Sequence, residues 1–146
     1  MLSKKAKYAL KALFSLAHEY GSEAVLIADI AEKEGIPKKF LEAILLDLKN
    51  HGILYSRRGK MGGYGLLRNP EQITVGEVVR IIDGPLALVP CARQNGYQPC
   101  EECHDIETCA IRITLKKVRD ATAEILDGTT LSDCTRIEKK ALDWMI

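Results

Sequence analysis

Four cysteines lie close together in a polar stretch of the chain. They are Cys91, Cys100, Cys103 and Cys109, and eight, two and five residues separate them. Reduced thiols grouped in one loop usually share a partner, because thiolates bind zinc and iron–sulfur clusters. Cys100 and Cys103 have CxxC spacing, so both sulfurs can reach one metal site. The sequence therefore predicts a metal-binding or redox-active loop.

The residue types alone leave the bound group open. Sets of four sulfur ligands hold either zinc or an iron–sulfur cluster, and a metal-free thiol or disulfide switch is the third alternative. His104 in the same loop is a further candidate ligand, although a histidine in a polar loop is more often only solvated. The fifth cysteine, Cys134, is isolated near Leu131, and we expect it to be a small buried apolar residue.

The composition favours one compact intracellular unit. The chain has 146 residues and a net charge of +1, and no apolar run approaches the roughly 20 residues that span a bilayer. The basic, apolar N-terminus lacks a small-residue cleavage site, and lysines interrupt its apolar positions, which favours an amphipathic helix over an export signal. We expect a cytoplasmic protein whose thiols are reduced, without a disulfide framework or a membrane partner.

Three short helices are predicted at the start of the chain. Apolar residues recur at helical spacing over 3–20, 27–34 and 38–50, and Gly21, Gly35 and Gly52 follow these segments. Ser3 is the expected N-cap of the first helix. Pro37 stands at the first turn of the third helix, where its missing N–H costs nothing. A tight turn before the third helix is typical of a helix-turn-helix.

A glycine-rich hairpin and a fourth helix complete residues 1–84. Residues 53–56 and 64–67 alternate like strands, and the glycines between them supply the backbone freedom that a hairpin or wing tip requires. Thr74 is expected to cap a helix over 75–82, with Glu77 completing a capping box.

A long amphipathic helix is predicted over residues 109–126. Its apolar stripe is narrow: Ile111, Leu115, Val118, Thr122, Ile125 and Leu126. Such a stripe favours a coiled-coil-like seam with a second copy of the chain; packing against its own N-terminal domain is the alternative. A last helix begins at Thr130 and ends at Trp144.

The predicted fold class is therefore mainly α with a small β-hairpin wing. We divide the chain into a winged helix-turn-helix (1–84), a cysteine-rich loop (85–108), a dimerisation helix (109–127) and a C-terminal extension (128–146).

Basic residues concentrate where a DNA-binding protein needs them. Residues 1–68 carry 12 Lys/Arg and 7 Asp/Glu, a charge of +5, whereas residues 69–146 carry 9 and 13, a charge of −4. Flanking basic groups anchor phosphates, and a hairpin can deliver an arginine into a minor groove. The candidate DNA contacts are Lys38 and Lys39 on the third helix and Arg57, Arg58, Lys60, Gly62, Gly63 and Tyr64 on the hairpin.

Two other classes of protein are weighed against a DNA-binding one. An enzyme is disfavoured, because the sequence has no nucleophile elbow, no phosphate-cradling loop in strand–helix context and no paired carboxylates in an apolar setting. A protein-interaction module with a zinc scaffold is the second alternative.

Over nearly its whole length the chain carries three segments in order: SKKAKYALKALFSLA, IADIAEKEGIPKKFLEAILLDLKNHGIL and SRRGKMGGYGLLRNPEQITVGEVVRIIDG, the last with the specific wing motif RGxxGGYxL. This order of motifs resembles the Rrf2 family of bacterial transcription regulators. It implies a homodimeric winged helix-turn-helix that binds an operator. It also implies that Glu42 contacts a base and Arg58 enters the minor groove. Lys39 stands where the family often has serine, which suggests a phosphate contact.

The resemblance also implies a ligand set for the cysteine loop. Better-known members use three cysteines and a fourth ligand of another type, either a carboxylate on the first helix or a histidine after the last cysteine. Lys7 and Arg112 stand at the matching positions here, so Cys100 is the candidate replacement in an all-cysteine set. We expect an iron–sulfur cluster, [2Fe–2S] or [4Fe–4S], with zinc as second choice, and a regulator that senses iron–sulfur or redox status.

Overall fold

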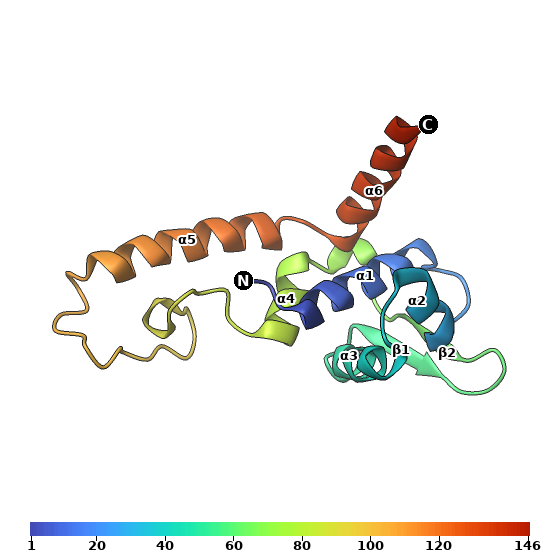
Figure 1. Ribbon diagram of the computed structural model, residues 1–146, viewed down its shortest axis with the longest axis horizontal. Helices are drawn as coiled ribbons and strands as arrows, with labels where there is room; N and C mark the ends of the chain where they lie inside the picture. Colours follow the sequence, from blue (N-terminus) through green and yellow to red (C-terminus); the bar gives the residue numbers. More distant parts are fainter.

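The computed structural model describes residues 1–146 and is mainly helical, with one two-stranded antiparallel sheet (Figure 1). The elements, in order, are α1 (Lys4–His18), α2 (Ile27–Glu34), α3 (Lys38–Asn50), β1 (Leu54–Arg57), β2 (Gly63–Leu66), η1 (Pro70–Gln72), α4 (Val75–Asp83), η2 (Pro90–Ala92), α5 (Ala110–Asp127) and α6 (Leu131–Met145). The predicted fold class, mainly α with a small hairpin, is confirmed.

The core lies where α1, α3, the sheet and α4 meet. The apolar face of α1 carries Ala6, Ala9 and Ala12 beside Leu13 and Leu16, all buried. Small side chains let neighbouring helices approach α1 closely, and each buried leucine contributes about 1.5–3 kcal/mol of apolar burial. On α3 the buried residues are Leu41, Ile44, Leu45 and Leu48. The outer face of α3 is thereby held toward solvent.

The hairpin is tied to the segment that precedes α2. Leu54 pairs with Leu66 in the antiparallel register, and both are buried in the core. Val25 and Tyr64 exchange two backbone hydrogen bonds of 2.8 Å each. These bonds fix the base of the wing relative to α2 and α3.

The start of α4 differs in one detail from the prediction. Thr74 Oγ1 accepts a hydrogen bond from the Glu77 amide at 3.1 Å, as expected of an N-cap. The Glu77 carboxylate, however, accepts from Arg68 Nη1 at 2.7 Å instead of returning to the cap. The predicted capping box at this site is therefore half formed, because a guanidinium competes for the carboxylate. A complete capping box is found at Thr130 and Asp133, where α6 begins.

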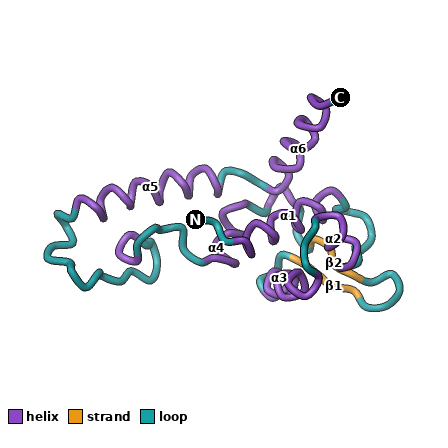
Figure 2. The backbone as a smooth tube through the Cα atoms, in the orientation of Figure 1, coloured by secondary structure: helices purple, strands orange, loops and turns teal.

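The chain after α4 leaves the winged domain and returns to it. The segment between α4 and α5 is loop except for η2 (Figure 2), and α5 then runs back toward α1 and α4 (Figure 1). The Leu131 amide donates to the Ile73 carbonyl at 2.9 Å, and Leu131 is fully buried in the core. The base of α6 is therefore part of the winged domain. No helix is both long and apolar enough to cross a bilayer.

Two helical surfaces have no partner within the chain. None of the residues of α5 is buried. The outer half of α6 projects from the body (Figure 1) and exposes Ile137, Leu142 and Trp144. Both helices were predicted, but α6 extends one residue further than the predicted end at Trp144.

Candidate DNA groove and cysteine loop

A groove of about 530 Å³ lies between α3, the start of α2 and the wing. Seven of the nine predicted DNA contacts line it: Lys38, Glu42, Arg57, Arg58, Gly62, Gly63 and Tyr64. Lys39 is exposed beside the groove but does not line it, and Lys60 lines a neighbouring cavity. Residues from two separate segments of the sequence thus converge on one surface.

The N-terminus of α3 faces this groove without a side-chain cap. Pro37 occupies the N-cap position and accepts no hydrogen bond through a side chain. Two lysines follow it, although cations at a helix N-terminus oppose the helix dipole. Their position is therefore explained better by an anionic ligand than by helix stability, since free amides at this end also bind phosphate.

Lys49 and Ser56 also line the groove, and sequence reasoning missed both. Lys49 follows Glu42 by seven residues on α3, so the two lie on the same helix face. Helical periodicity could have identified Lys49. Ser56 precedes the wing arginines on β1, and nothing in its residue type marks it.

The wing glycines are required by packing within the protein. Gly63 has φ +137°, and a Cβ there would lie 2.1 Å from the Val25 carbonyl oxygen. A Cβ at Gly62 would lie 2.5 Å from the Arg57 carbonyl oxygen. The sequence predicted that these glycines supply the backbone freedom of a hairpin tip, and Gly62 and Gly63 were also counted among the DNA contacts. The tight turn and the Val25 contact are the structural reasons why glycine is required here.

The four loop cysteines occupy one neighbourhood at different depths. Cys91 lies in η2 and is 8% exposed, Cys103 and Cys109 are half-buried, and Cys100 is exposed. The Cys103 amide donates to the Cys100 carbonyl at 3.1 Å, which closes the CxxC turn. Partial burial, and then the thiols of Cys100, Cys109 and Cys91, raise the pKa of Cys103. All these thiols are free, and no three His, Cys, Asp or Glu side chains are spaced to hold a metal ion.

Asp105 shapes the connection from Cys103 to Cys109. Its carboxylate accepts from the Glu107 amide at 2.9 Å and from Thr108 Oγ1 at 3.0 Å. These hydrogen bonds, the Glu107 bond first, lower the pKa of Asp105. The turn brings the chain back to α5. His104 is exposed beside it.

Two arginines of α5 hold the buried end of the loop. Arg112 Nε donates to the Cys91 carbonyl at 3.0 Å, and Arg119 Nη1 donates to the Ala92 carbonyl at 2.6 Å. The Arg112 guanidinium also lies 5.7 Å from the centre of the Tyr97 ring. Arg112 was considered only as a residue in place of a histidine ligand. In the structure it fixes the backbone of Cys91 to the long helix.

The other end of α5 is joined to the winged domain. Arg80 on α4 donates to both carboxylate oxygens of Asp127, at 2.6 and 2.9 Å. This pairing raises the pKa of Arg80 and lowers that of Asp127. Helix α5 is therefore bonded to the loop near its start and to α4 at its end.

A family model described as "Rrf2: Iron-dependent Transcriptional regulator" matches residues 2–136. The chain belongs to the Rrf2 family. Its relatives are transcriptional regulators, and the predicted family resemblance is confirmed.

Named relatives agree with this Rrf2 membership. A putative HTH-type transcriptional regulator, rrf2-like, of Rhodobacter capsulatus is 46% identical over 136 residues, covering 91% of both chains. The solved structure of CymR, described as the global cysteine regulator of B. subtilis, has a TM-score of 0.78 at 31% identity and covers 94% of this chain and 97% of its own. IscR of T. potens has a TM-score of 0.77 at 28% identity, covering 97% and 90%.

The Rrf2 relatives do not select one signal for this chain. One solved neighbour is named a cysteine regulator and another is IscR, and both have the same fold.

Proposed function

We propose that this Rrf2 regulator binds operator DNA as a homodimer and senses iron–sulfur or redox status through Cys91, Cys100, Cys103 and Cys109. The observation that supports DNA binding most strongly is the common groove of α3 and the wing, which seven of the predicted contacts line. The division into winged domain, loop, dimerisation helix and extension is part of this proposal.

The two walls of the groove would contact different parts of the DNA. Glu42 is exposed on α3 and can accept a hydrogen bond from a cytosine amino group in the major groove. Lys38, Lys39 and Lys49 supply positive charge for phosphates around it. Arg57 and Arg58 are exposed on the wing, from which an arginine can enter the adjacent minor groove.

The dimer would form along α5. Ile111, Val118 and Ile125 are 68%, 41% and 67% exposed and follow one another at seven-residue intervals. Leu115 and Thr122 lie four residues after the first two, so the stripe has the a and d spacing of a coiled coil. Arg112 and Arg119 lie beside this stripe and hold the cysteine loop. The loop would therefore lie near the contact between subunits.

The four thiols suit a sulfur-bound inorganic group by their chemistry. All four lie in one loop. Burial first, and then the neighbouring thiols, raise the pKa of Cys103. A bound cation would instead favour the thiolate form. An iron–sulfur cluster, [2Fe–2S] or [4Fe–4S], would supply a redox-responsive centre, and a zinc ion would supply only a structural one. The all-cysteine set alone favours neither, and we prefer the iron–sulfur cluster because the matching family model is described as iron-dependent.

Contacts within the chain give a route by which a change in the cysteine loop would affect DNA binding. Arg112 and Arg119 connect the loop backbone to α5, and the Arg80–Asp127 pair connects α5 to α4. A change in the order of the loop would thus act on the helix that sets the spacing of the two winged domains. Operator affinity would change because both half-sites must be reached together.

Anaerobic purification tests the ligand set. Iron, sulfide and zinc are measured per chain, together with the visible absorption spectrum. We expect iron and sulfide in equal amounts, and loss of both in single Ser variants of Cys91, Cys100, Cys103 and Cys109. Cys134→Ser is the matched control and should retain them. A zinc-only, colourless protein would support the alternative, a zinc- or thiol-based winged-helix regulator or scaffold.

Binding to a DNA duplex selected from a genomic pool tests whether the groove contacts DNA. DNA fragments bound by the chain are recovered from a genomic pool, and affinity is measured by fluorescence anisotropy. Glu42→Gln should relax preference at one base pair by about 1–3 kcal/mol without changing the salt dependence. Unchanged base preference in this variant would remove Glu42 from the interface.

A further inference from the structure

The wing ends in a tight turn of four residues. The Gly62 amide donates a hydrogen bond to the Gly59 carbonyl at 3.0 Å, which makes Lys60 and Met61 the two central residues of a β-turn. The paired strands end before this turn, so it extends beyond the sheet. Lys60 and Met61 are therefore the outermost residues of the wing.

Met61 differs in kind from the other long side chains of the wing tip. Its neighbours Arg57, Arg58 and Lys60 are basic, whereas Met61 is apolar and 62% exposed. Single exposed apolar residues are common on protein surfaces, so exposure alone assigns no role. What distinguishes Met61 is its place among three cations at the end of the proposed DNA-contacting hairpin.

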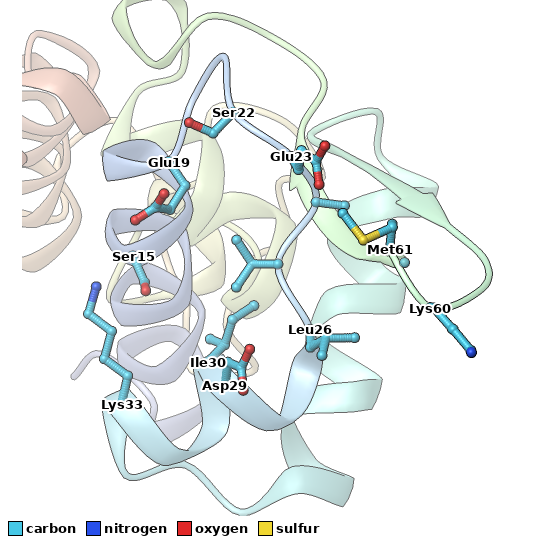
Figure 3. A pocket seen from close by; sticks show the side chains of 13 residues that line it. Ser15, Glu19, Ser22, Glu23, Leu26, Asp29, Ile30, Lys33, Lys60 and Met61 are labelled. Atoms are coloured by element: carbon cyan, nitrogen blue, oxygen red, sulfur yellow. The ribbon is translucent and has the colours of Figure 1, made fainter.

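Packing within the chain accounts for little of the Met61 surface. An open cavity of about 520 Å³ lies beside the tip, and Met61 lines it together with Val25 and Leu26 (Figure 3). The amino end of Lys60 is directed away from this cavity in the same view. Because most of the Met61 side chain remains in contact with solvent, its apolar surface is free for a partner. Its three rotatable bonds let the thioether turn toward one.

The position of the turn indicates which part of a duplex it would meet. Gly59 and Gly62 both line the groove between α3 and the wing, so the turn begins at the border of that groove. A duplex whose major groove holds α3 presents the adjacent minor groove to an arm or wing beside this helix. The turn would therefore face the floor of a minor groove.

The minor-groove floor differs between the two kinds of base pair. A·T pairs show only acceptors there, whereas G·C pairs add the guanine N2 amino group, which is a donor. A methionine side chain offers at most a weak acceptor, so its approach would desolvate that donor without replacing its hydrogen bond to water. Against A·T pairs no donor is buried, and a narrow A·T minor groove also attracts the neighbouring cations.

We propose that Met61 is a specificity-determining residue, which contacts the minor-groove floor and selects A·T over G·C pairs beside the bases that α3 contacts. Arg58 lies in the same minor groove, and Lys60 contacts phosphate from the same turn. The inference rests on the proposed binding of DNA by the wing. It adds a sequence preference that phosphate contacts alone do not give.

Inosine substitution tests the role of the guanine amino group. A·T pairs that flank the α3 contacts in the selected duplex are replaced, one at a time, by G·C or by inosine·C, which lacks the N2 amino group. We expect the wild-type chain to bind the G·C duplex about tenfold more weakly and the inosine·C duplex as well as the A·T duplex. In Met61→Ala the G·C penalty should largely disappear. Met145→Ala, which removes an 84% exposed methionine from α6, is the matched control and should keep the full penalty.

Two further measurements separate Met61 from its surroundings. A penalty that arises from groove width acts through a cation, so it should survive in Met61→Ala and be lost in Arg58→Ala. The urea midpoint of Met61→Ala should equal that of wild type, because the side chain is mostly exposed. A lowered midpoint with an unchanged G·C penalty would make Met61 only a wall of the neighbouring cavity.

Other outcomes also overturn the proposal. They are equal G·C penalties in wild type and Met61→Ala, a G·C penalty that inosine does not relieve, and equal wild-type binding to the A·T and G·C duplexes. Each of these would leave DNA binding by the wing intact. Failure of the wild-type chain to bind any selected duplex would instead refute the proposed function, and this inference with it.

Discussion

Arg58 illustrates how a single side chain can be assigned by both motif and position. It belongs to the RGxxGGYxL wing, it is exposed, and it lines the groove opposite Glu42. The residue type and its neighbours were readable from the sequence. That Arg58 and Glu42 share one groove follows only from the folded hairpin.

We predict that Arg58→Ala weakens operator binding about tenfold and lowers the slope of log affinity against log salt by about one. The physical reason is the loss of one cation from the phosphate-rich interface. Anisotropy titrations over a range of salt concentrations measure both quantities. Lys117→Ala removes an exposed cation from α5 and should leave them unchanged; equal losses in the two variants would indicate only a general charge effect.

Asp127 makes a pH-dependent contribution to stability. Its two hydrogen bonds from Arg80 lower its pKa below the usual value of about 3.9. A lowered folded-state pKa means that the stabilisation is fully present above about pH 3.9 and is lost as the pH falls through the folded-state value. Both side chains are partly exposed, at 40% and 44%, so solvent screens the pair.

Asp127→Asn should therefore lower the free energy of unfolding at pH 7 by about 0.2–1 kcal/mol, and the difference from wild type should be smaller at pH 3. Urea unfolding at the two pH values measures it. Asp143→Asn, near the exposed end of α6, should have no effect at either pH. A loss for Asp127→Asn that is as large at pH 3 as at pH 7 would contradict the ionic origin.

At the scale of elements, the wing depends on a close backbone approach. Gly63 combines a positive φ with a Cβ position that the Val25 carbonyl already occupies. Gly59 in the same hairpin has φ +99° but open space around it. A side chain at Gly59 would therefore meet backbone strain alone, whereas a side chain at Gly63 would meet both strain and a steric clash.

We predict that Gly59→Ala costs about 1–2 kcal/mol of folding stability through strain alone, and that Gly63→Ala costs more because the wing must also leave Val25. Chemical denaturation measures both losses. Gly63→Ala should also weaken DNA binding beyond its effect on stability, since the wing is displaced. Equal losses for the two variants would mean that the Val25 contact is not what requires Gly63.

Helix α5 is the element that we propose pairs with a second copy of the chain. Val118→Asp places a charge in the exposed heptad stripe and should convert the dimer to a monomer, because a buried unpaired carboxylate is costly at an interface. Sedimentation velocity gives the oligomeric state. Lys117→Asp, on the neighbouring outer face, should remain dimeric; a wild-type chain that sediments as a monomer would contradict the seam.

Local sequence patterns predicted the helices well, whereas contacts between residues far apart in the sequence could not be predicted. Periodicity identified α2 over 27–34 and α3 over 38–50 as they occur. The pairing of Glu77 with Arg68 was not predicted, because it depends on the fold bringing Arg68 beside α4. The same holds for Arg112 and Arg119, whose carbonyl partners lie 21 and 27 residues earlier in the chain.

At the scale of the whole molecule, two regions are coupled through one helix. The loop that carries the four cysteines is bonded to the start of α5, and α4 of the winged domain is bonded to its end. The family and its fold are shown by the comparisons. The chemistry of the proposed signal rests on the four thiols, which lie in one neighbourhood as their spacing suggested, although no three of them are spaced to hold a metal ion in this structure.

Operator affinity with and without the sulfur-bound group tests this coupling most directly. Protein purified without air is divided, one half is stripped with a chelator under reducing conditions, and both are titrated against the same selected duplex at matched salt. We predict that the two forms differ in affinity by about tenfold or more, as expected for an allosteric coupling of 1–3 kcal/mol. The Cys134→Ser variant should show the same difference. Equal affinity of the loaded and stripped forms would contradict the account.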